Sequence, residues 1–438
     1  MDRLVQVFGY FSGSVGSKFG RDEEVRSKEE VLSKRKDIIG EECYRNEYVC
    51  FRSKCQIFYK DDPFMVSKAS MQYLYDEKGK QYLDCISNVQ HVYECHPNSR
   101  ELLLKNQISR SEANDLALRL ARDYTGHTDA IVIDHAYHGH VTTTMQMSPY
   151  KFDHGSTLPQ PEWVHVAPCP DVYRGEYRLA DNELNDPEKL EKAGVYYSDA
   201  VNHLIDKAEA NGRTVAAYFA EALQSCGGQV IPPPGYFCDV ARHVRNHGGL
   251  VVIDEVQTGF GRVGSKFWAH QLFDDGFCPD IVTMGKPMGN GFPVSAVATT
   301  RKIADALGGQ VGYFNTYGGN PVACAAVLGV MRVIREENLL KHSQEMGEEF
   351  EKQLNQLKKK YQCIGDVRGV GLFWGIDLVK DRQTREPDQE LALALILKLR
   401  RERGILLNAD GPHTNILKIK PPLCFDKQNL MDVSFFRF

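Results

Sequence analysis

The sequence predicts an α/β protein in which a mainly parallel β-sheet is covered by helices on both faces. Short apolar runs alternate with amphipathic stretches through the middle of the chain, as in parallel sheets with connecting helices. Glu221, Asp254 and Lys286 follow such runs, where ligands of these sheets bind. The 438 residues, 42% of them hydrophobic, can form a large core and two domains. Strands are expected at 130–133, 215–220, 250–253, 281–283 and 293–298.

The sequence changes in character after Pro321, which marks the expected domain boundary. Residues 1–60 are expected to form an atypical N-terminal segment, residues 61–320 a large domain, and residues 321–438 a smaller α+β domain. The smaller domain is expected to contain two helices followed by two strands. These elements are expected over Val322–Glu336, Leu340–Lys360, Gly371–Asp377 and Asn415–Ile419.

Composition argues against several classes of protein. The net charge of -5 gives no general attraction to nucleic acid or anionic lipid, and no apolar run is long enough to span a bilayer. The 12 cysteines are scattered without a Cys-x-x-Cys pair, which indicates reduced thiols in an intracellular protein and no metal site. The first twenty residues contain Arg3, Lys18 and several serines, a weak mitochondrial presequence. A mitochondrial location is therefore expected, with the cytoplasm as the alternative.

Asp254 and Lys286 together suggest chemistry that uses pyridoxal phosphate. This cofactor needs an amine to hold its aldehyde as a Schiff base and a carboxylate to keep its pyridine nitrogen protonated. An apolar strand ending in Asp-Glu also occurs in phosphate-loop nucleotidases, but their loop requires Gly-Lys-Ser/Thr and Lys286 is followed by Pro287. Either residue alone would more often be a helix-capping aspartate or a surface lysine.

Three further motifs fit the same cofactor. Ser111 is the expected N-cap of a helix over 111–121, whose free amides would bind phosphate. Tyr137, in Tyr137-His138-Gly139, follows a strand and offers an aromatic ring for the cofactor. Thr316, within Asn315–Asn320, offers a hydroxyl and flexible backbone for phosphate. Each motif alone also fits an ordinary capped helix, a core tyrosine or a turn.

Together these segments resemble the class III, or ornithine-type, family of fold-type I pyridoxal-phosphate enzymes. The resemblance covers about Asp61 to Phe425 and implies a mainly parallel sheet of the seven-stranded type with a smaller α+β C-terminal domain. The matching segments are Ser111–Asn114, Tyr137–Gly139, Val252–Arg262, Thr283–Lys286, Thr316–Pro321 and Gly369–Leu372.

The resemblance implies a role for each matched residue. Lys286 would be the catalytic residue that holds the cofactor and carries the proton, and Asp254 would pair with the pyridinium. An obligate homodimer, or a dimer of dimers, would follow from the family's shared sites. The other cofactor contacts would be Ser111 at the phosphate, Tyr137 and His138 at the ring, Gln257 at the ring hydroxyl, Glu221 as polar support, and Thr316 at the neighbouring subunit's phosphate.

Departures from the usual family pattern bear on the substrate. Aminotransferases of this class use arginine to bind a substrate carboxylate, because its planar fork makes two contacts. Here His140 and Lys418 stand at two positions where arginine is common, and Cys226 stands where some members have a gating glutamate. These changes resemble the phospholyase branch, which acts on O-phosphoethanolamine or 5-phosphohydroxylysine. Lys418 and His140 are therefore candidate substrate contacts, as are Lys420 and Arg174 for the substrate phosphate.

The resemblance favours a lyase that eliminates phosphate and ammonia from O-phosphoethanolamine to give acetaldehyde. The segments 223–228, 284–291 and 410–413 look more like the branch members that use ethanolamine phosphate. The alternatives are a 5-phosphohydroxylysine lyase, an alanine-glyoxylate or ω-type aminotransferase, and an inactive dimerising homologue.

The chain is expected to be shortened before Ser111. Only thirteen residues separate Pro97 from Ser111, whereas the family places helices and the strand that feeds the phosphate loop there. Arg110 stands where the family has a glycine; its charge suits phosphate, but it lacks the dihedral freedom of glycine. Residues 43–55 resemble an insertion, and the family is expected to continue beyond Phe438 into a closing helix.

Overall fold

The computed structural model describes residues 66–70, 72–76, 78–85, 103–107, 109–156, 158–273, 276–307 and 313–434. The chain divides into two compact units, Met1–Tyr82 and Leu83–Phe438. This division does not test the boundaries expected near residues 60 and 320, which stay predictions. The N-terminal segment, its presequence character and the insertion at 43–55 lie outside the described residues. Within the described residues, no helix combines the length and apolar character needed to cross a bilayer.

The first unit contains a small antiparallel pair, β1 (Val66–Ser70) and β2 (Tyr73–Asp76), and the start of β3 (Gln81–Asp84). The Asp76 carboxylate accepts hydrogen bonds from two backbone amides of the turn that follows β2, both at 2.9 Å. An aspartate at this position stabilises a tight turn by satisfying its free amides.

The second unit contains the predicted sheet, which has seven strands in the order β4-β10-β9-β8-β7-β5-β6. The strands from β9 to β6 in this order are parallel, and β10 pairs antiparallel with both β9 and β4. The prediction of a mainly parallel sheet is therefore confirmed. The strands are β4 (Leu103–Gln107), β5 (Asp129–Ile133), β6 (Val164–Ala167), β7 (Val215–Glu221), β8 (Leu250–Asp254), β9 (Ile281–Met284) and β10 (Ser295–Thr299).

Strand β4 lies in the segment before Ser111 that was expected to be shortened. A piece of the large domain was expected to be missing there, but a strand before the phosphate loop is present, because Leu103–Gln107 pairs with β10. The next helix in the chain is α4 (Arg110–Thr125), which begins at the predicted phosphate loop.

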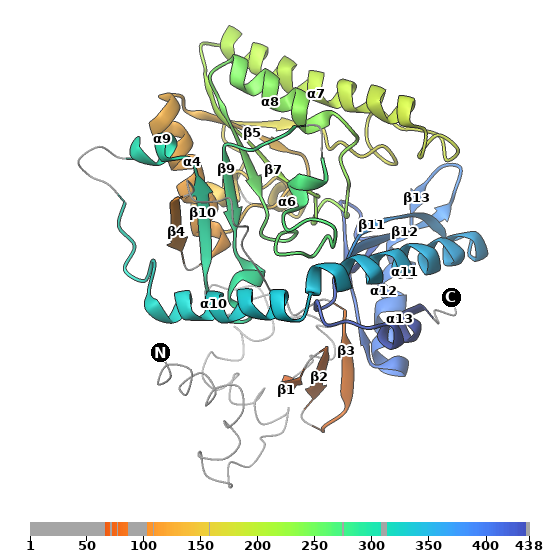
Figure 1. Cartoon of the computed structure of the whole chain (residues 1–438). Helices are drawn as coiled ribbons and strands as arrows, with labels where there is room; N and C mark the ends of the chain where they lie inside the picture. Colours follow the sequence, from red (N-terminus) through yellow and green to blue (C-terminus); the bar gives the residue numbers. More distant parts are fainter. Residues whose placement is uncertain are drawn as a thin grey trace, which may run out of the picture. The chain divides into compact units, whose positions relative to one another are not determined.

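Helices cover both faces of the sheet (Figure 1). Alternate residues of a strand face opposite sides, and β5 shows this clearly. Ile131 and Ile133 pack into a core with α7 (Pro187–Ala210) and α8 (Tyr236–Asn246), whereas Ala130 and Val132 pack into a core with α4. The near-continuous apolar character of the strands follows from this burial on both sides.

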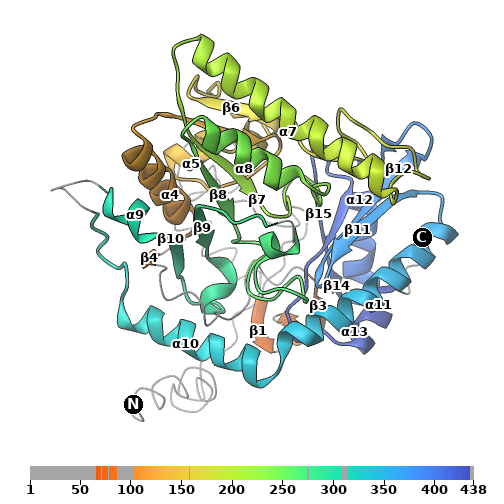
Figure 2. The same cartoon turned by 45° about the horizontal axis from the view of Figure 1, so that its top comes forward.

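The C-terminal part forms a second sheet, with the path β11-β12-β16-β15 and β13 paired to β12. Helix α11 runs along β11 in both views (Figure 2). The predicted helices and strands of this part are confirmed. The strands are β11 (Ile364–Val370), β12 (Phe373–Asp381), β13 (Glu386–Pro387), β14 (Ile405–Leu406), β15 (Asn408–Asp410) and β16 (Ile416–Ile419).

Leu83 and Asp84 of β3 pair in parallel with β14.

The remaining helices are of two kinds, the longer helices of the C-terminal part and a set of short ones. The larger helices of the C-terminal part are α10 (Pro321–Glu336), α11 (Leu339–Lys360), α12 (Gln389–Lys398) and α13 (Lys427–Ser434). Helix α12 continues into a π-helical turn, Leu399–Arg403. The short helices are α5 (Thr142–Gln146), α6 (Pro149–Asp153), η2 (Ala269–Leu272), η3 (Lys286–Gly289) and α9 (Arg301–Asp305).

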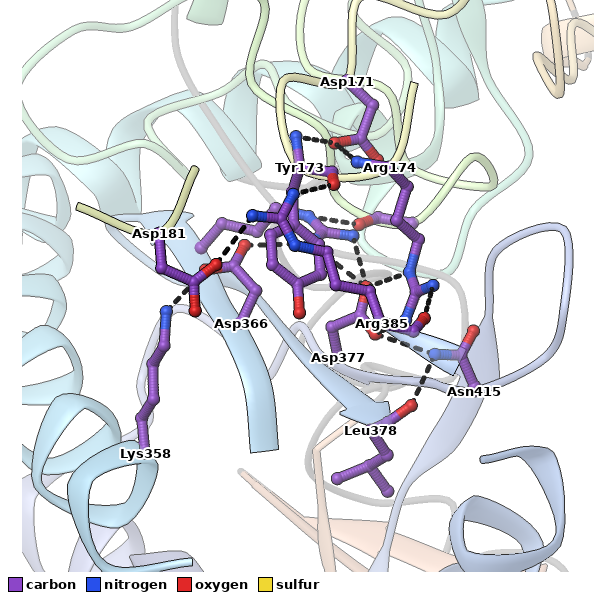
Figure 3. A network of polar contacts seen from close by, with 12 residues as sticks. Asp171, Tyr173, Arg174, Asp181, Lys358, Asp366, Asp377, Leu378, Arg385 and Asn415 are labelled. Atoms are coloured by element: carbon purple, nitrogen blue, oxygen red, sulfur yellow. Dashed lines mark hydrogen bonds and ion pairs between the residues drawn. The ribbon is translucent and has the colours of Figure 1, made fainter. Parts of the chain in front are cut away.

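A buried ion network joins the second sheet to the loop after β6 (Figure 3). Asp377 on β12 is fully buried, and its carboxylate accepts hydrogen bonds from Arg174 Nε at 2.8 Å and Nη2 at 2.5 Å, and from Asn415 at 2.8 Å. Arg368 lies 3.4 Å from the same carboxylate. Arg174 was a candidate contact for the substrate phosphate, but we assign its guanidinium to this network.

Replacing Asp377 with alanine is expected to lower the free energy of unfolding by about 3–5 kcal/mol, because Arg174 would lose its carboxylate in a buried site. Urea unfolding followed by circular dichroism would measure the loss. The matched control is Glu386→Ala, whose carboxylate is 56% exposed and pairs with Lys380. That change should cost about 1 kcal/mol or less. Equal effects of the two substitutions would contradict a supporting role for Asp377.

Candidate active site

Three predicted residues meet at the carboxyl edge of the large sheet. Glu221 ends β7 and lies beside Asp254 at the end of β8, and Asp254 pairs in register with Thr283 on β9. Lys286 begins η3 two residues after β9 ends. Because β7, β8 and β9 are parallel neighbours, their polar ends come together, as the sequence predicted.

Asp254 is the most heavily contacted of these residues. It is fully buried, and its Oδ2 accepts hydrogen bonds from Arg110 Nη2 at 2.7 Å, Arg110 Nε at 3.0 Å and Asn114 Nδ2 at 2.8 Å. His138 Nδ1 lies 3.1 Å from the same oxygen, and the Val256 amide donates to Oδ1 at 3.1 Å. Burial alone would raise the pKa of Asp254, but Arg110 and His138 outweigh burial and lower it. The carboxylate is therefore held ionised.

The Lys286 amine is tuned toward its neutral form. Burial, and after it the charge of the Arg110 cation, lower the pKa of Lys286 to about 7. A lysine in this range is partly neutral near pH 7, so it can act as a nucleophile and can take up a proton. Glu221, one of its charged neighbours, is buried, and burial raises the pKa of its carboxyl group.

His138 and Tyr137 both contact members of this group, His138 through Asp254 and Tyr137 through Arg110. The buried His138 contacts Asp254 through its ring and is held by hydrogen bonds from its backbone amide to Ser148 and from Asn114 to its carbonyl. Tyr137 is half-buried, and the Arg110 guanidinium lies over its ring at 5.2 Å. The structure therefore places His138 at the predicted pyridinium partner and Tyr137 beside Arg110.

Ser111 lies at the start of α4, but it is not the N-cap that the sequence predicted. Ser109 is the N-cap and forms a capping box with Glu112. The Ser111 hydroxyl instead accepts a hydrogen bond from the His140 amide at 2.9 Å. The Tyr137-His138-Gly139 loop crosses here so closely that a Cβ on Gly139 would lie 2.7 Å from Ser111 Oγ, and Gly139 has a φ of +144°. Only glycine fits that position without strain.

Two buried lysines add to the charge near Lys286. Lys418 forms an ion pair with Asp410, which outweighs burial and raises its pKa. Lys420 donates to Gln257, and burial followed by the charges of Lys286 and Lys418 lowers its pKa well below the usual value. The sequence therefore identified two buried lysines near Lys286, one paired with a carboxylate and one whose pKa is strongly lowered.

Two other predicted residues, Thr316 and His140, are exposed. Thr316 is exposed in the loop before α10, and neighbouring Asn315 donates to Glu112 at 3.3 Å. His140 is exposed, and burial and then Lys151 lower the pKa of its ring. Two contacts of Asp254 were not assigned from the sequence, Arg110 and Asn114. Asn114 lies in the recognised segment Ser111–Asn114. Its partner Asp254 is 140 residues away in the sequence, so no local pattern could reveal the contact.

Comparison with known proteins identifies the family. A family model described as aminotransferase class-III matches residues 90–434. The chain belongs to this family. It is 65% identical over 466 residues to ethanolamine-phosphate phospho-lyase homolog 1 of Caenorhabditis elegans, which covers 99% of this chain and 97% of that protein. The class III fold-type I architecture predicted from the sequence is thus confirmed.

Two further proteins are similar to this chain over most of their length. The Drosophila melanogaster protein alanine--glyoxylate aminotransferase 2-like is 43% identical, covering 93% of this chain and 85% of that protein. A solved phospholyase from Arthrobacter, in complex with phosphoethanolamine, is 34% identical with a TM-score of 0.79, covering 92% of this chain and 99% of that one. The alignment to the nematode protein is longer than the 438 residues here, so part of that relative has no counterpart in this chain.

Proposed function

We propose that this chain is a pyridoxal-phosphate-dependent lyase that eliminates phosphate and ammonia from O-phosphoethanolamine and forms acetaldehyde. The observation that carries the proposal is the set of buried lysines around Lys286, in a chain that is similar to a phospho-lyase homologue and to a phospholyase solved with phosphoethanolamine. The negative charge of a substrate phosphate would favour the protonated form of a buried lysine beside it.

The residues at the site fit the cofactor in two respects. Pyridoxal phosphate, when bound, withdraws electrons from the carbon that bears the substrate amine. Lys286 supplies the amine that would hold the cofactor, and its lowered pKa suits it to take the proton from that carbon. The ionised Asp254 supplies the carboxylate expected beside a pyridinium, although Arg110 already contacts it.

The charge pattern also favours a phosphorylated substrate over an amino acid. An aminotransferase site holds a substrate carboxylate with a free arginine fork. The arginine that the structure places beside Lys286 is Arg110, and its Nε and Nη2 both donate to Asp254. Lys420 stands near Lys286 and Lys418 and donates to the side-chain amide oxygen of Gln257. Lys418 and Lys420 are therefore the proposed contacts for the substrate phosphate, and His140 remains a further candidate.

We also propose a homodimer, with Thr316 reaching the cofactor phosphate of the neighbouring subunit. Support comes from apolar side chains exposed in the loop around Thr316 and on the following helix α10: Phe314 is 86% exposed, Tyr317 66% and Leu328 65%. Large apolar side chains exposed at one face of a protein often mark an interface. A mitochondrial location, with the cytoplasm as the alternative, is proposed from the family resemblance and from the composition of the first twenty residues alone.

Purified protein supplied with pyridoxal phosphate is expected to release inorganic phosphate from O-phosphoethanolamine, with acetaldehyde formed in equal amount. Phosphate is measured by a colorimetric assay and the aldehyde by coupled reduction. Parallel reactions contain 5-phosphohydroxylysine or an alanine and glyoxylate pair. Faster release from 5-phosphohydroxylysine would move the substrate assignment to that amine. Amino transfer from alanine without phosphate release would contradict the lyase and support the aminotransferase alternative.

A further inference from the structure

The side chain of Arg110 enters the site from the first turn of α4. Arg110 is only 7% exposed, and its guanidinium makes two hydrogen bonds to Asp254, at 2.7 and 3.0 Å, and lies 3.6 Å from Glu221. The same guanidinium lies over the ring of Tyr137. Arg110 occupies a helical position, so its backbone is unstrained, and its charge points to the sheet edge rather than outward from the helix start.

These contacts are the ones that the cofactor ring requires. A guanidinium is a flat cation that pairs with carboxylates and stacks on aromatic faces, as a protonated pyridine ring also does. Asp254 is the carboxylate of the site and Tyr137 its aromatic ring, and Arg110 engages both. Asp254 Oδ2 already accepts from Arg110, Asn114 and His138, so no further donor fits there while Arg110 stays. Asp254 is therefore closed to a pyridinium for as long as Arg110 occupies it.

The arrangement around Arg110 is incompletely satisfied, so it can be displaced. Among the described residues, Arg110 Nη1, both carboxylate oxygens of Glu221 and His138 Nε2 are buried without a hydrogen-bond partner. A buried polar atom left without a hydrogen-bond partner destabilises the arrangement that contains it. Both oxygens of the buried Asp377 carboxylate accept hydrogen bonds, whereas neither oxygen of Glu221 beside Arg110 does.

We propose that Arg110 is an internal competitor for the cofactor ring: the chain rests with this side chain on Asp254 and Tyr137, and pyridoxal phosphate binds only by displacing it. The inference rests on the cofactor named in the proposed function. The affinity of the chain for pyridoxal phosphate would then depend on the side chain at position 110. Withdrawal of the side chain would also free Asp254 and expose the ring of Tyr137 together.

The test compares the affinity of three purified proteins for pyridoxal phosphate. The unchanged chain, Arg110→Ala and Arg119→Ala are titrated with the cofactor, and the visible absorption band of the lysine-bound cofactor is followed. Arg119 is the matched control, because it lies on the same helix, with a side chain 41% exposed and paired with Asp123. Arg110→Ala is expected to bind about tenfold or more tightly than the unchanged chain, since the competing ion pair is gone. Arg119→Ala should match the unchanged chain.

Two outcomes would overturn the proposal, and they differ in what else they reject. Equal dissociation constants for the unchanged chain and Arg110→Ala would reject the competition but leave the proposed cofactor in place. A visible band in neither protein would reject both. Arg110→Lys guards against failure of the alanine variant to fold, because lysine keeps a charge but cannot make the two-pronged contact with Asp254. The affinity of Arg110→Lys for pyridoxal phosphate should fall between those of the unchanged chain and Arg110→Ala. An affinity equal to that of the unchanged chain would also overturn the proposal.

Discussion

Lys286→Ala is expected to abolish phosphate release from O-phosphoethanolamine, with a fall of at least about 10²–10⁴-fold in the turnover rate. The change removes the amine that would hold the cofactor and the group that would take the proton. The visible absorption of the cofactor-loaded protein should disappear with it. Both quantities are measured on the purified variant at saturating pyridoxal phosphate.

The fold should tolerate this substitution. Lys286 stands near other cations, including Arg110 and Lys418, and both lower its pKa. Removing one of several like charges relieves repulsion, so the melting temperature should stay the same or rise. A marked fall in melting temperature would mean that lost activity reflects misfolding.

Two controls refine the result for Lys286. Lys341→Ala removes a lysine whose side chain is 69% exposed, and it should change neither turnover nor absorption. Lys286→Arg keeps a positive charge but offers no neutral amine near pH 7, because arginine stays protonated. The arginine variant should therefore be as inactive as the alanine variant. Residual turnover near that of the unchanged protein in either Lys286 variant would exclude Lys286 as the catalytic group.

The central strands could be predicted from the sequence because each is buried on both faces. The runs at 130–133 and 250–253 are apolar throughout, which double burial requires. Strand β4 escaped prediction because Leu103–Gln107 is half polar and lies at the edge of the sheet. Its pairing with β10 depends on residues far along the chain, which no local pattern reveals.

The start of α4 was misplaced by two residues for a different reason. Ser109 and Ser111 are both good capping residues, and Ser111 was predicted because it directly precedes the leucine-rich helical pattern. The sequence Ser109-Arg-Ser-Glu112 already contains the Ser-x-x-Glu spacing of a capping box, and this local signal identifies Ser109. The correction matters because it places Arg110 in the first turn of the helix.

The chemistry of the site was predictable to the extent that it lies at strand ends. Asp254 and Lys286 follow apolar runs, and parallel strands bring such ends together. The direction of the Arg110 side chain was not predictable, because the sequence placed its charge at a phosphate loop. What determines it is an ion pair with a residue 144 positions away, and only the tertiary structure brings the two together.

Asp254→Ala is expected to have the second large effect, and it should destabilise the protein even without cofactor. The substitution leaves the buried Arg110 with only Glu221, which lies 3.6 Å away. Removing one partner of a buried ion pair costs about 3–5 kcal/mol, because the other charge stays buried without compensation. Urea unfolding of cofactor-free protein measures this loss. Turnover should also fall by about 10²-fold or more, since the carboxylate for the pyridinium is lost.

A double-mutant cycle separates the ion pair from other roles of Asp254. If Asp254→Ala destabilises the protein mainly because the Arg110 charge is left without its carboxylate, the two single substitutions should not be additive. The protein with both substitutions should then be more stable than the sum of the two single losses predicts. The expected coupling is about 0.5–3 kcal/mol, the range found for residues in direct contact. Additive losses would show that the two side chains do not pair in solution. An Asp254→Ala protein as stable as the unchanged chain would lead to the same conclusion, and Asp254 would then serve the cofactor alone.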